Sequence, residues 1–247
     1  MNKEQANRQL NKHDQEIGPT VPDWQTPSAV QEAPETQVLS GQYCSLSKLE
    51  AKHASKLHQV FSKADDSLWT YLPYGPFDNL SGYEDLIDTL NSNWRKTSLA
   101  YCIQSADQKD VLGLCAYLRM MPQAGSIEIG HLCFSPTLQK TPAATEAIFL
   151  LIDAVFKLGY RRCEWKCNDL NLPSIAAAKR YGFKYEGTFR QAQVVKGHNR
   201  DTAWLSIVDH EWQSLKPCFE AWLDPQNFTA DGKQIKRLSS LTSALTT

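Results

Sequence analysis

The clearest pattern in the chain is a long stretch with apolar residues at helical spacing. In Ala143–Leu158 the apolar positions recur every three or four residues, and Gly159 follows as a stop signal. Weaker patterns of the same kind predict helices at Lys52–Phe61, Gly82–Trp94, Ser174–Arg180 and Glu211–Leu215. Apolar runs bounded by turn residues predict strands at Val38–Leu46, Leu99–Gln104, Val111–Met120, Ser126–Phe134, Arg162–Lys166, Phe183–Val195 and Asp201–Val208.

The same patterns divide the chain into three parts. Residues 1–35 are polar, contain four prolines and show no period, so we expect an arm that wraps the domain or stays mobile. Residues 36–215 carry the predicted helices and strands and should form one domain. Residues 216–247 are expected to be a polar C-terminal extension.

Composition excludes several classes of protein. The chain has 26 basic and 27 acidic residues, a net charge of −1, and no basic excess that would indicate nucleic-acid binding. Its longest strongly apolar stretch, Ala147–Phe156, is interrupted by Asp153 and falls far short of the roughly 20 residues of a membrane span. The polar N-terminus shows no signal peptide. We therefore expect a cytoplasmic protein that does not bind membranes.

The cysteines agree with that location. All seven are scattered, and most lie in strand-like runs, which indicates reduced thiols. Cys163 and Cys167 have a C-x3-C spacing, and His131 and His198 could complete a metal site. Alternation along one strand explains the spacing better, so we expect no metal.

The most informative segment is Phe134–Ala147, where a strand ends, a loop turns and the long helix begins. Thr141 suits the N-cap, and Pro142 suits the first helical position, where its missing N–H costs nothing. The small Ala143 and Ala144 would let a ligand approach the first turn, whose free N–H groups and dipole favour an anion such as a pyrophosphate. A plain, well-capped helix is the alternative interpretation.

Two motifs resemble those of the GNAT N-acetyltransferases. Gln139–Ala144 is similar to the Gln/Arg-x-x-Gly-x-Gly/Ala turn that binds coenzyme A in that family, although Pro142 replaces its first glycine. Downstream, Asn171 and Ser174 fit an Asn-x-x-Ser motif, and Gly182–Gly187 fits Gly-Phe-x-x-Glu-Gly. The continuation after the first turn resembles the ribosomal-protein N-terminal acetyltransferases, the RimJ/RimL-like branch.

The resemblance implies a GNAT-like α+β fold, a mixed and mostly antiparallel sheet of about seven strands flanked by helices, with an opening between strands four and five. It implies direct transfer from acetyl-coenzyme A (acetyl-CoA) to a primary amine, either a small molecule or a protein N-terminus. A coenzyme A-binding module without turnover is the alternative. The family match places the donor against Leu132, Phe134, Gln139, Lys140, Thr141, Ala143, Ala144 and Asn171.

Three residues are candidates for the chemistry. Alternation sets Ile127 and Ile129 on one face of their strand and Glu128 on the other, which would front the cleft, so Glu128 is the first candidate for the proton acceptor. Glu128 could instead pair with an Arg or Lys on a neighbouring strand. His131 is a second candidate, although alternation groups it with the isoleucines. Ala178 stands where many GNAT enzymes carry a tyrosine acid, which leaves Ser174 as proton donor or as a helix cap.

The loop of residues 69–77 lies where the resemblance to the GNAT family implies the acceptor-binding region. Its aromatic residues could form a wall for an apolar or cationic acceptor, or they could hold the N-terminal arm against the domain: Trp69, Tyr71, Tyr74 and Phe77. The hairpin turn of residues 195–201 would form the opposite wall, with Arg190, Arg200 and Asp201 in an ion-pair network. A homodimer through this loop and the arm is a further hypothesis.

Overall fold

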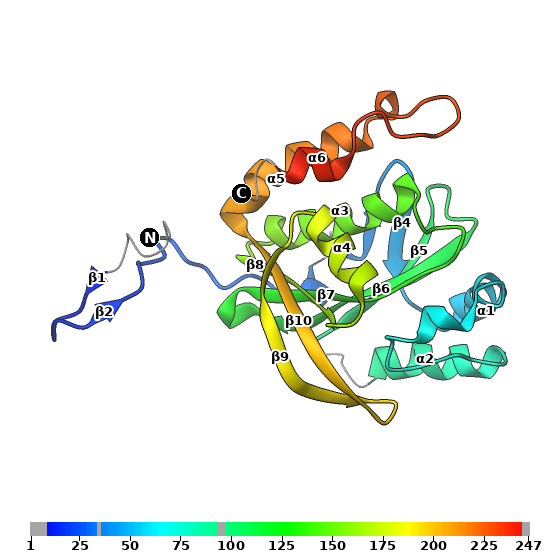
Figure 1. Ribbon diagram of the computed structural model, residues 1–247, viewed down its shortest axis with the longest axis horizontal. Helices are drawn as coiled ribbons and strands as arrows, with labels where there is room; N and C mark the ends of the chain where they lie inside the picture. The colour runs from blue at the N-terminus through cyan, green and yellow to red at the C-terminus, as the bar shows by residue number, and fades with distance from the viewer. Residues whose placement is uncertain (1–8, 34–35, 93–96, 244–247) are drawn as a thin grey trace.

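A computed structural model of the chain describes residues 9–33, 36–92 and 97–243, so the last residues of the predicted helix Gly82–Trp94 lie outside the described part. Helices cover both faces of a central twisted sheet (Figure 1). The described strands of this sheet run in the order β3-β4-β5-β6-β7-β8-β10-β9, and β1 and β2 form a separate small hairpin. All the predicted elements are present in the predicted order.

The elements have the following bounds. The strands are β1 (Gln9–Leu10), β2 (Glu16–Ile17), β3 (Val38–Ser40), β4 (Cys44–Lys48), β5 (Leu99–Ser105), β6 (Val111–Met121), β7 (Ser126–Phe134), β8 (Arg162–Asn168), β9 (Lys184–Val195) and β10 (His198–Val208). The helices are α1 (Ala54–Phe61), α2 (Leu80–Ser92), α3 (Pro142–Lys157), α4 (Leu172–Arg180), α5 (Asp209–Leu223) and α6 (Leu238–Thr242).

Every neighbouring pair in the described sheet is antiparallel except β7 and β8, which are parallel. The sheet is therefore mixed and mostly antiparallel, as predicted. One expectation was wrong: the first strand, Val38–Leu46, is a hairpin of two strands, β3 and β4. This extra strand gives the described sheet eight strands instead of about seven.

A buried glutamate on α3 stabilises the turn of that hairpin. The Glu146 carboxylate accepts hydrogen bonds from the backbone N–H groups of Gln42 (2.7 Å), Tyr43 (2.6 Å) and Cys44 (2.8 Å). At Gly41 an added Cβ would lie 2.3 Å from the carboxyl carbon of Glu146, so only glycine fits there. The partner of this turn is more than 100 residues away in sequence, and a local pattern does not reveal it.

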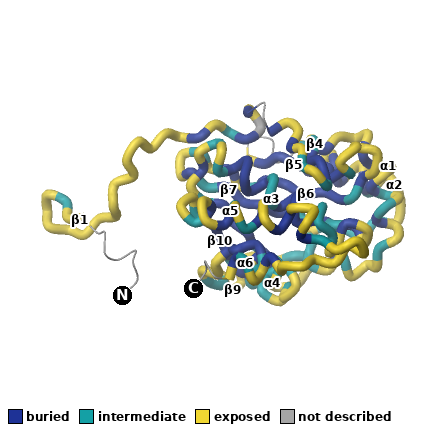
Figure 2. The backbone as a smooth tube through the Cα atoms, turned by 90° about the horizontal axis from the view of Figure 1, so that it is seen from above, coloured by how far each residue is buried: buried dark blue, intermediate teal, exposed yellow. Residues whose placement is uncertain are grey.

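Two apolar clusters stabilise the sheet from opposite faces (Figures 1 and 2). One lies between the sheet and helices α3 and α5 and includes Ile127, Ile129 and Ile148. The other lies between the sheet and helices α1 and α2 and includes Trp69 and Cys133. Membership in one cluster or the other shows which face of the sheet a buried residue of β7 occupies. The position of the site depends on that face.

Both ends of the domain carry additional packed segments. Val30 is fully buried in the first cluster, whereas the β1–β2 hairpin is exposed and projects away from the domain (Figures 1 and 2). Helix α5 continues past the predicted Glu211–Leu215 and through Pro217, and Phe219 and Trp222 on it are buried. The divisions at residues 35 and 215 stay predictions, as does the homodimer.

Two further findings concern the described part of the chain. Among residues 9–33, 36–92 and 97–243, no helix is both long enough and apolar enough to cross a membrane. The same residues contain no group of three His, Cys, Asp or Glu side chains placed to hold a metal ion.

Candidate functional site

The site begins where β7 and β8 separate. The two strands pair over four residues, from Ser126–Arg162 to Ile129–Trp165. Strand β7 then continues to Phe134 and β8 to Asn168 without further pairing between their described residues. The backbone of β7 beyond Ile129 is consequently open on its β8 side, as the predicted opening between strands four and five requires, and a ligand that carries amides can pair with it as an added strand does.

A cavity of about 930 Å³ lies at this separation, a volume within the range of small-molecule sites. Six residues predicted for the site line it: Tyr71, Glu128, His131, Leu132, Asn171 and Ser174. The other predicted residues fall into two groups away from its wall, one around the first turn of α3 and one in the aromatic cluster under α1 and α2.

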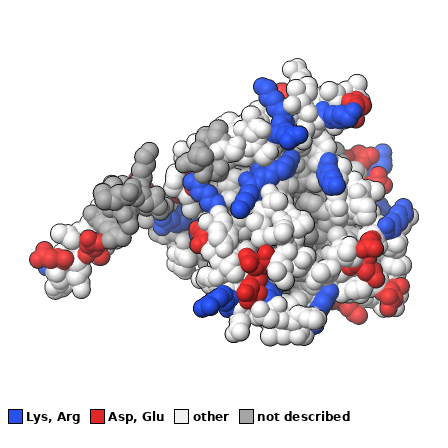
Figure 3. Space-filling model, in the orientation of Figure 1, with Lys and Arg blue, Asp and Glu red and all other residues white. Residues whose placement is uncertain are grey.

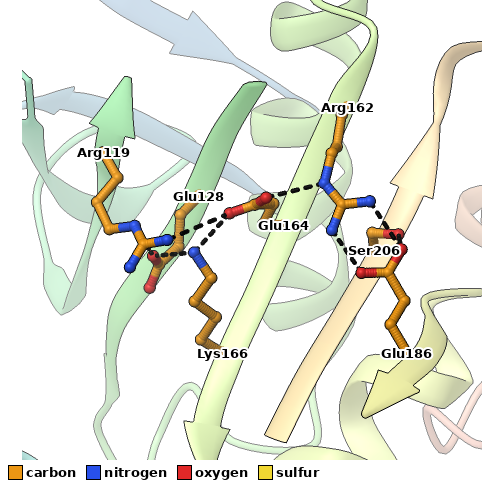
Figure 4. Close-up of polar contacts among 7 residues, drawn as sticks. All are labelled: Arg119, Glu128, Arg162, Glu164, Lys166, Glu186 and Ser206. Carbon is orange, nitrogen blue, oxygen red and sulfur yellow. Dashed lines mark hydrogen bonds and ion pairs between the residues drawn. The ribbon is translucent and has the colours of Figure 1, made fainter. Parts of the chain in front are cut away.

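Glu128 lies on the cavity wall and belongs to an ion-pair network (Figure 4). Lys166 Nζ lies 3.1 Å and Arg119 Nε 3.4 Å from the Glu128 carboxylate. The network continues through Glu164, which accepts from Lys166 and from Arg162. Both interpretations of Glu128 from the sequence therefore describe its contacts, because it faces the cleft and also pairs with basic residues of neighbouring strands.

The electrostatic states of the two carboxylates differ. Burial raises the pKa of Glu128 above its ordinary value, and the charges of Lys166 and Arg119 only partly oppose that rise. Burial also favours a higher pKa for Glu164, but hydrogen bonds from Arg162 and Lys166 outweigh it and lower that pKa. Glu128 is thus the carboxylate of the pair with the greater affinity for a proton, and it is the one on the cavity wall.

His131 also faces the cavity, contrary to the sequence expectation. Between Ala116–Gly130 and Leu114–Cys133, β7 contains one residue more than β6, and His131 has a φ of +49°. This β-bulge reverses the alternation, so His131 points away from the isoleucines and stacks on Tyr74, with Nδ1 3.1 Å from its hydroxyl. Burial, with the charge of Arg200 as the second cause, lowers the pKa of His131 to about 4, so the imidazole is neutral at pH 7.

Ser174 and Asn171 lie together at the start of α4. Asn171 is the N-cap, and its Oδ1 accepts from the backbone N–H of Ser174 at 3.2 Å. The Ser174 hydroxyl oxygen accepts from Trp165 Nε1 at 3.0 Å. The oxygen of Asn171 therefore serves the helix, while its amide NH₂ remains a donor on the cavity wall.

The first turn of α3 has the features of an anion site. Thr141 is the N-cap and accepts from the Ala144 N–H at 3.2 Å, Pro142 occupies the first helical turn, and Lys140 has a φ of +63°. Gln139 Nε2 donates to the Phe134 carbonyl at 2.9 Å, which ties the turn to the end of β7. In the described part of the chain, the N–H groups of Lys140 and Ala143 have no hydrogen-bond partner. These two donors, together with the helix dipole, suit a phosphate group.

The aromatic loop divides between the core and the cavity. Trp69 is buried, and its ring packs against Phe61 of α1, Tyr83 of α2 and Phe77. The loop rings pack on α1 and α2 instead of on the N-terminal arm. Tyr71 is the one of the four predicted aromatic residues on the described cavity wall, and its hydroxyl donates to the Leu170 carbonyl at 3.1 Å.

The sequence suggested Arg200 only for an ion-pair network, and it left several polar residues of the wall out of the site, among them Arg119, Lys166, Arg200, Thr202 and Trp204. Lys166 Nζ lies 3.6 Å from the centre of the Trp204 ring. The last three alternate along β10, so they share one face of that strand, and this spacing is the sequence signal that could have identified them.

The match to known proteins decides the family. Residues 45–184, more than half of the chain, match the family described as "Acetyltransferase (GNAT) domain". The chain belongs to the GNAT family. It is similar to a GCN5-related N-acetyltransferase from Brucella melitensis, at 39% identity and a TM-score of 0.84 over 90% of this chain and 100% of that one. This membership confirms the predicted fold and acetyl transfer as the activity.

Two more distant matches are also described as acetyltransferases. An uncharacterized N-acetyltransferase, p20, from Bacillus licheniformis is 28% identical over 68% of this chain and 93% of its own length. An acetyltransferase from Salmonella typhimurium that modifies the N-terminal serine of a 50S ribosomal subunit protein shares the fold, at 20% identity and a TM-score of 0.60 over 69% of this chain and 98% of that one.

Proposed function

We propose that this GNAT acetyltransferase uses acetyl-CoA as donor and acetylates a small primary amine by direct transfer. The observation that carries the proposal is the separation of β7 from β8 beside the Glu128 carboxylate, at one cavity. That arrangement supplies the three requirements of the reaction: a place for the donor, a proton acceptor for the amine, and an enclosed wall for the acceptor.

The donor is proposed to lie along β7 and across the first turn of α3. The open backbone of Leu132 and Phe134 suits the amides of the pantetheine arm, and the free N–H groups of Lys140 and Ala143 suit the diphosphate. Asn171 offers its NH₂ group from the opposite side. Bound there, acetyl-CoA supplies an acyl group activated as a thioester.

We propose Glu128 as the residue that accepts the proton of the amine. Burial raises its pKa toward the working range of a general base, and its position on the wall gives it access to an acceptor in the cavity. The neutral His131 on the same face could accept a hydrogen bond from the amine, which would help to orient it.

We propose that the Ser174 hydroxyl donates a hydrogen bond to the departing sulfur. Since its oxygen already accepts from Trp165 Nε1, the hydroxyl acts as a donor, and the departing sulfur would compete for its proton with the Cys167 sulfur. Replacement of Ser174 by Ala is expected to lower kcat about tenfold, with the affinity for coenzyme A unchanged. Steady-state kinetics with calorimetry of coenzyme A binding would check this, and an unchanged kcat would assign Ser174 to helix capping alone.

The donor site is tested by a charge placed in the first turn of α3. Substitution of Ala143 by Asp keeps a residue that helix starts favour but sets a carboxylate beside the proposed diphosphate. We expect the Kd of coenzyme A to rise about tenfold or more, by repulsion between like charges. Isothermal titration calorimetry measures it.

Ala221, exposed on α5 and away from the cavity wall, provides the matched control. Ala221→Asp adds the same charge to the chain and should leave the Kd unchanged. Equal Kd values for both variants and the parent would mean that the diphosphate does not lie at the first turn of α3.

A small acceptor is favoured by two bridges between walls of the cavity. Lys196 Nζ, in the turn of the β9–β10 hairpin, donates to the Trp69 carbonyl at 2.8 Å, and Tyr71 donates to the Leu170 carbonyl. Both bridges join the aromatic loop to elements opposite it, which restricts the space that a protein chain would need. Release of thiol with a panel of small amines tests the proposal, and acetylation of peptide N-termini alone would contradict it.

A second candidate, a coenzyme A-binding module without turnover, is motivated by Ala178. This residue stands where a tyrosine acid is common in the family, and it is fully buried. Coenzyme A binding without thiol release by any amine would support this candidate over the enzyme.

A further inference from the structure

The charges on the cavity wall do not balance. Among the lining residues that the structure describes, Arg119, Lys166 and Arg200 are basic and only Glu128 is acidic. Arg119 and Lys166 both contact Glu128, and they share Glu164 behind the wall. Arg200 has no ion pair or side-chain hydrogen bond to any described residue, so its charge is the uncompensated one.

The neighbours of Arg200 supply no anion. His131 is neutral because burial and the charge of Arg200 lower its pKa, and burial raises the pKa of Cys167, which keeps its thiol protonated. Asp201, next in sequence, accepts instead from the Gln191 N–H at 2.7 Å and from Asn199 Nδ2 at 2.9 Å. The Asp169 carboxylate accepts from the Thr188 hydroxyl at 2.8 Å. The ion-pair network that the sequence suggested for Arg200 and Asp201 is therefore not formed by Arg200.

Three polar atoms on one face of β10 are buried without partners. They are Arg200 Nε, Thr202 Oγ1 and Trp204 Nε1, and none has a hydrogen-bond partner among the described residues. All three residues line the cavity, and Thr202 is only 6% exposed. Since buried polar atoms are normally paired, three unpaired ones in alternate positions indicate a face adapted to oxygen atoms of a ligand.

Among the described residues, the rest of the wall near Arg200 and Thr202 carries no charge: Gln193 opposite Arg200 and Asn168 opposite Thr202 are neutral amides, and apolar side chains lie beside them. Leu68 and Leu72 come from the aromatic loop, and Phe189 comes from β9, where its ring lies 4.5 Å from that of Trp204. An acceptor that fills this space would therefore have an apolar body, with its amine toward Glu128 and an anionic group toward Arg200.

We propose that the Arg200–Thr202–Trp204 face of β10 binds an anionic oxygen group of the acceptor, and that the acceptor is an amine that carries a carboxylate. This inference rests on the proposed function and names its substrate class. The guanidinium of Arg200 can bind a carboxylate through two parallel hydrogen bonds, while Thr202 and Trp204 offer additional donors. A polycationic amine would meet an excess of positive charge on this wall.

Matched acceptors test the class of substrate. Each amino carboxylate, in an α series and an ω series, is compared with its own amide, which keeps the amine and the body but removes the charge. We expect kcat/KM to be about 10- to 100-fold higher for the carboxylate in at least one series, the usual contribution of a hydrogen-bonded charge. Equal values within every pair would overturn the inference while leaving acetyl transfer intact.

Substitutions of Arg200 test the residue. In the Arg200→Gln variant kcat/KM for the carboxylate should fall about 10- to 100-fold, while that for the amide and the KM for acetyl-CoA stay unchanged. Arg200→Lys should recover part of the loss. Arg190→Gln is the matched control, because Arg190 is exposed on the adjacent strand and lies outside the cavity wall. An equal loss for carboxylate and amide would assign Arg200 to structure alone.

A binding measurement separates this inference from the proposed function. Phenylacetate and phenylacetamide differ in charge and contain no acceptor amine. Calorimetry with the whole chain therefore measures their affinity for the site without turnover. Phenylacetate should bind at least about tenfold more tightly than phenylacetamide, and Arg200→Gln should abolish the difference. Equal binding overturns the inference, whereas a lack of coenzyme A binding overturns the donor assignment and leaves this comparison readable.

Discussion

Replacement of Glu128 by Gln is expected to lower kcat/KM about 100-fold or more, with little change in the affinity for coenzyme A. Glutamine has almost the same shape but cannot accept the proton of the amine, and Glu128 is the one carboxylate on the described cavity wall. Lys166 keeps Glu164 as a partner, so the strands should stay in place. Steady-state kinetics with a saturating donor measures the loss.

The pH profile distinguishes a proton acceptor from a structural group. Since burial raises the pKa of Glu128, the parent enzyme should lose kcat/KM as the pH falls through a value above the ordinary 4.3 of a glutamate. This acidic limb of the pH profile should be absent from the residual activity of the Glu128→Gln variant. Glu164→Gln removes a carboxylate from the same network but not from the wall, and it should retain the limb (Figure 4). A limb that persists without Glu128 would assign the proton acceptor elsewhere.

The largest effect on stability is expected at Glu146, far from this chemistry. Substitution by Ala leaves the N–H groups of Gln42, Tyr43 and Cys44 without their acceptor in a part of the fold where Glu146 is only 4% exposed. Hydrogen bonds to a charged group contribute roughly 1.5–3 kcal/mol each, and their losses are not additive, so we expect the free energy of unfolding to fall by about 4 kcal/mol. Denaturation in urea measures it.

Glu220 provides the control for this substitution. It lies on α5, its side chain is 55% exposed, and its nearest basic partner, Lys216, is 3.9 Å away. Glu220→Ala makes the same chemical change in a helix and should alter the free energy of unfolding by no more than about 0.5 kcal/mol. Similar effects of the two substitutions would mean that Glu146 does not hold the β3–β4 turn.

Charged side chains on the surface of the chain indicate a binding site less clearly than these buried groups do. On the face that carries α4, α5 and α6, basic and acidic side chains occur together (Figure 3). This mixture agrees with the net charge of −1 from the sequence. Charge is informative in this protein where it is partly buried and unbalanced, as at Arg200.

The sequence predicts most of the fold because its signals are local. Helical spacing identified α3, and alternation placed Glu128 opposite Ile127 and Ile129. It could not predict the β3–β4 hairpin, since the carboxylate that holds the turn at Gly41 belongs to α3. The full length of α5 was missed because its second half depends on burial of Phe219 and Trp222 against the core.

Prediction of the site was limited by geometry that emerges only in the assembled sheet. One extra residue in β7 turns His131 toward the cavity, and Gly130, which precedes it inside the strand, is the only local sign of that bulge. Lys166 has no signal in the sequence and Arg200 suggested only an ion-pair network, because their surroundings come from β7 and β10 and from the aromatic loop. The motifs indicate a turn for the proposed donor, whereas the proposed acceptor wall follows only from contacts in the structure.

The two bridges beside the cavity have the same kind of acceptor. Lys196 and Tyr71 donate to main-chain carbonyls, those of Trp69 and Leu170, and the Leu170 side chain is 72% exposed. A carbonyl is present whatever side chain its residue bears. Leu170 can therefore be replaced in evolution without loss of the hydrogen bond from Tyr71. The side chain at this position can change selectivity while the contact between the aromatic loop and the segment before α4 is kept.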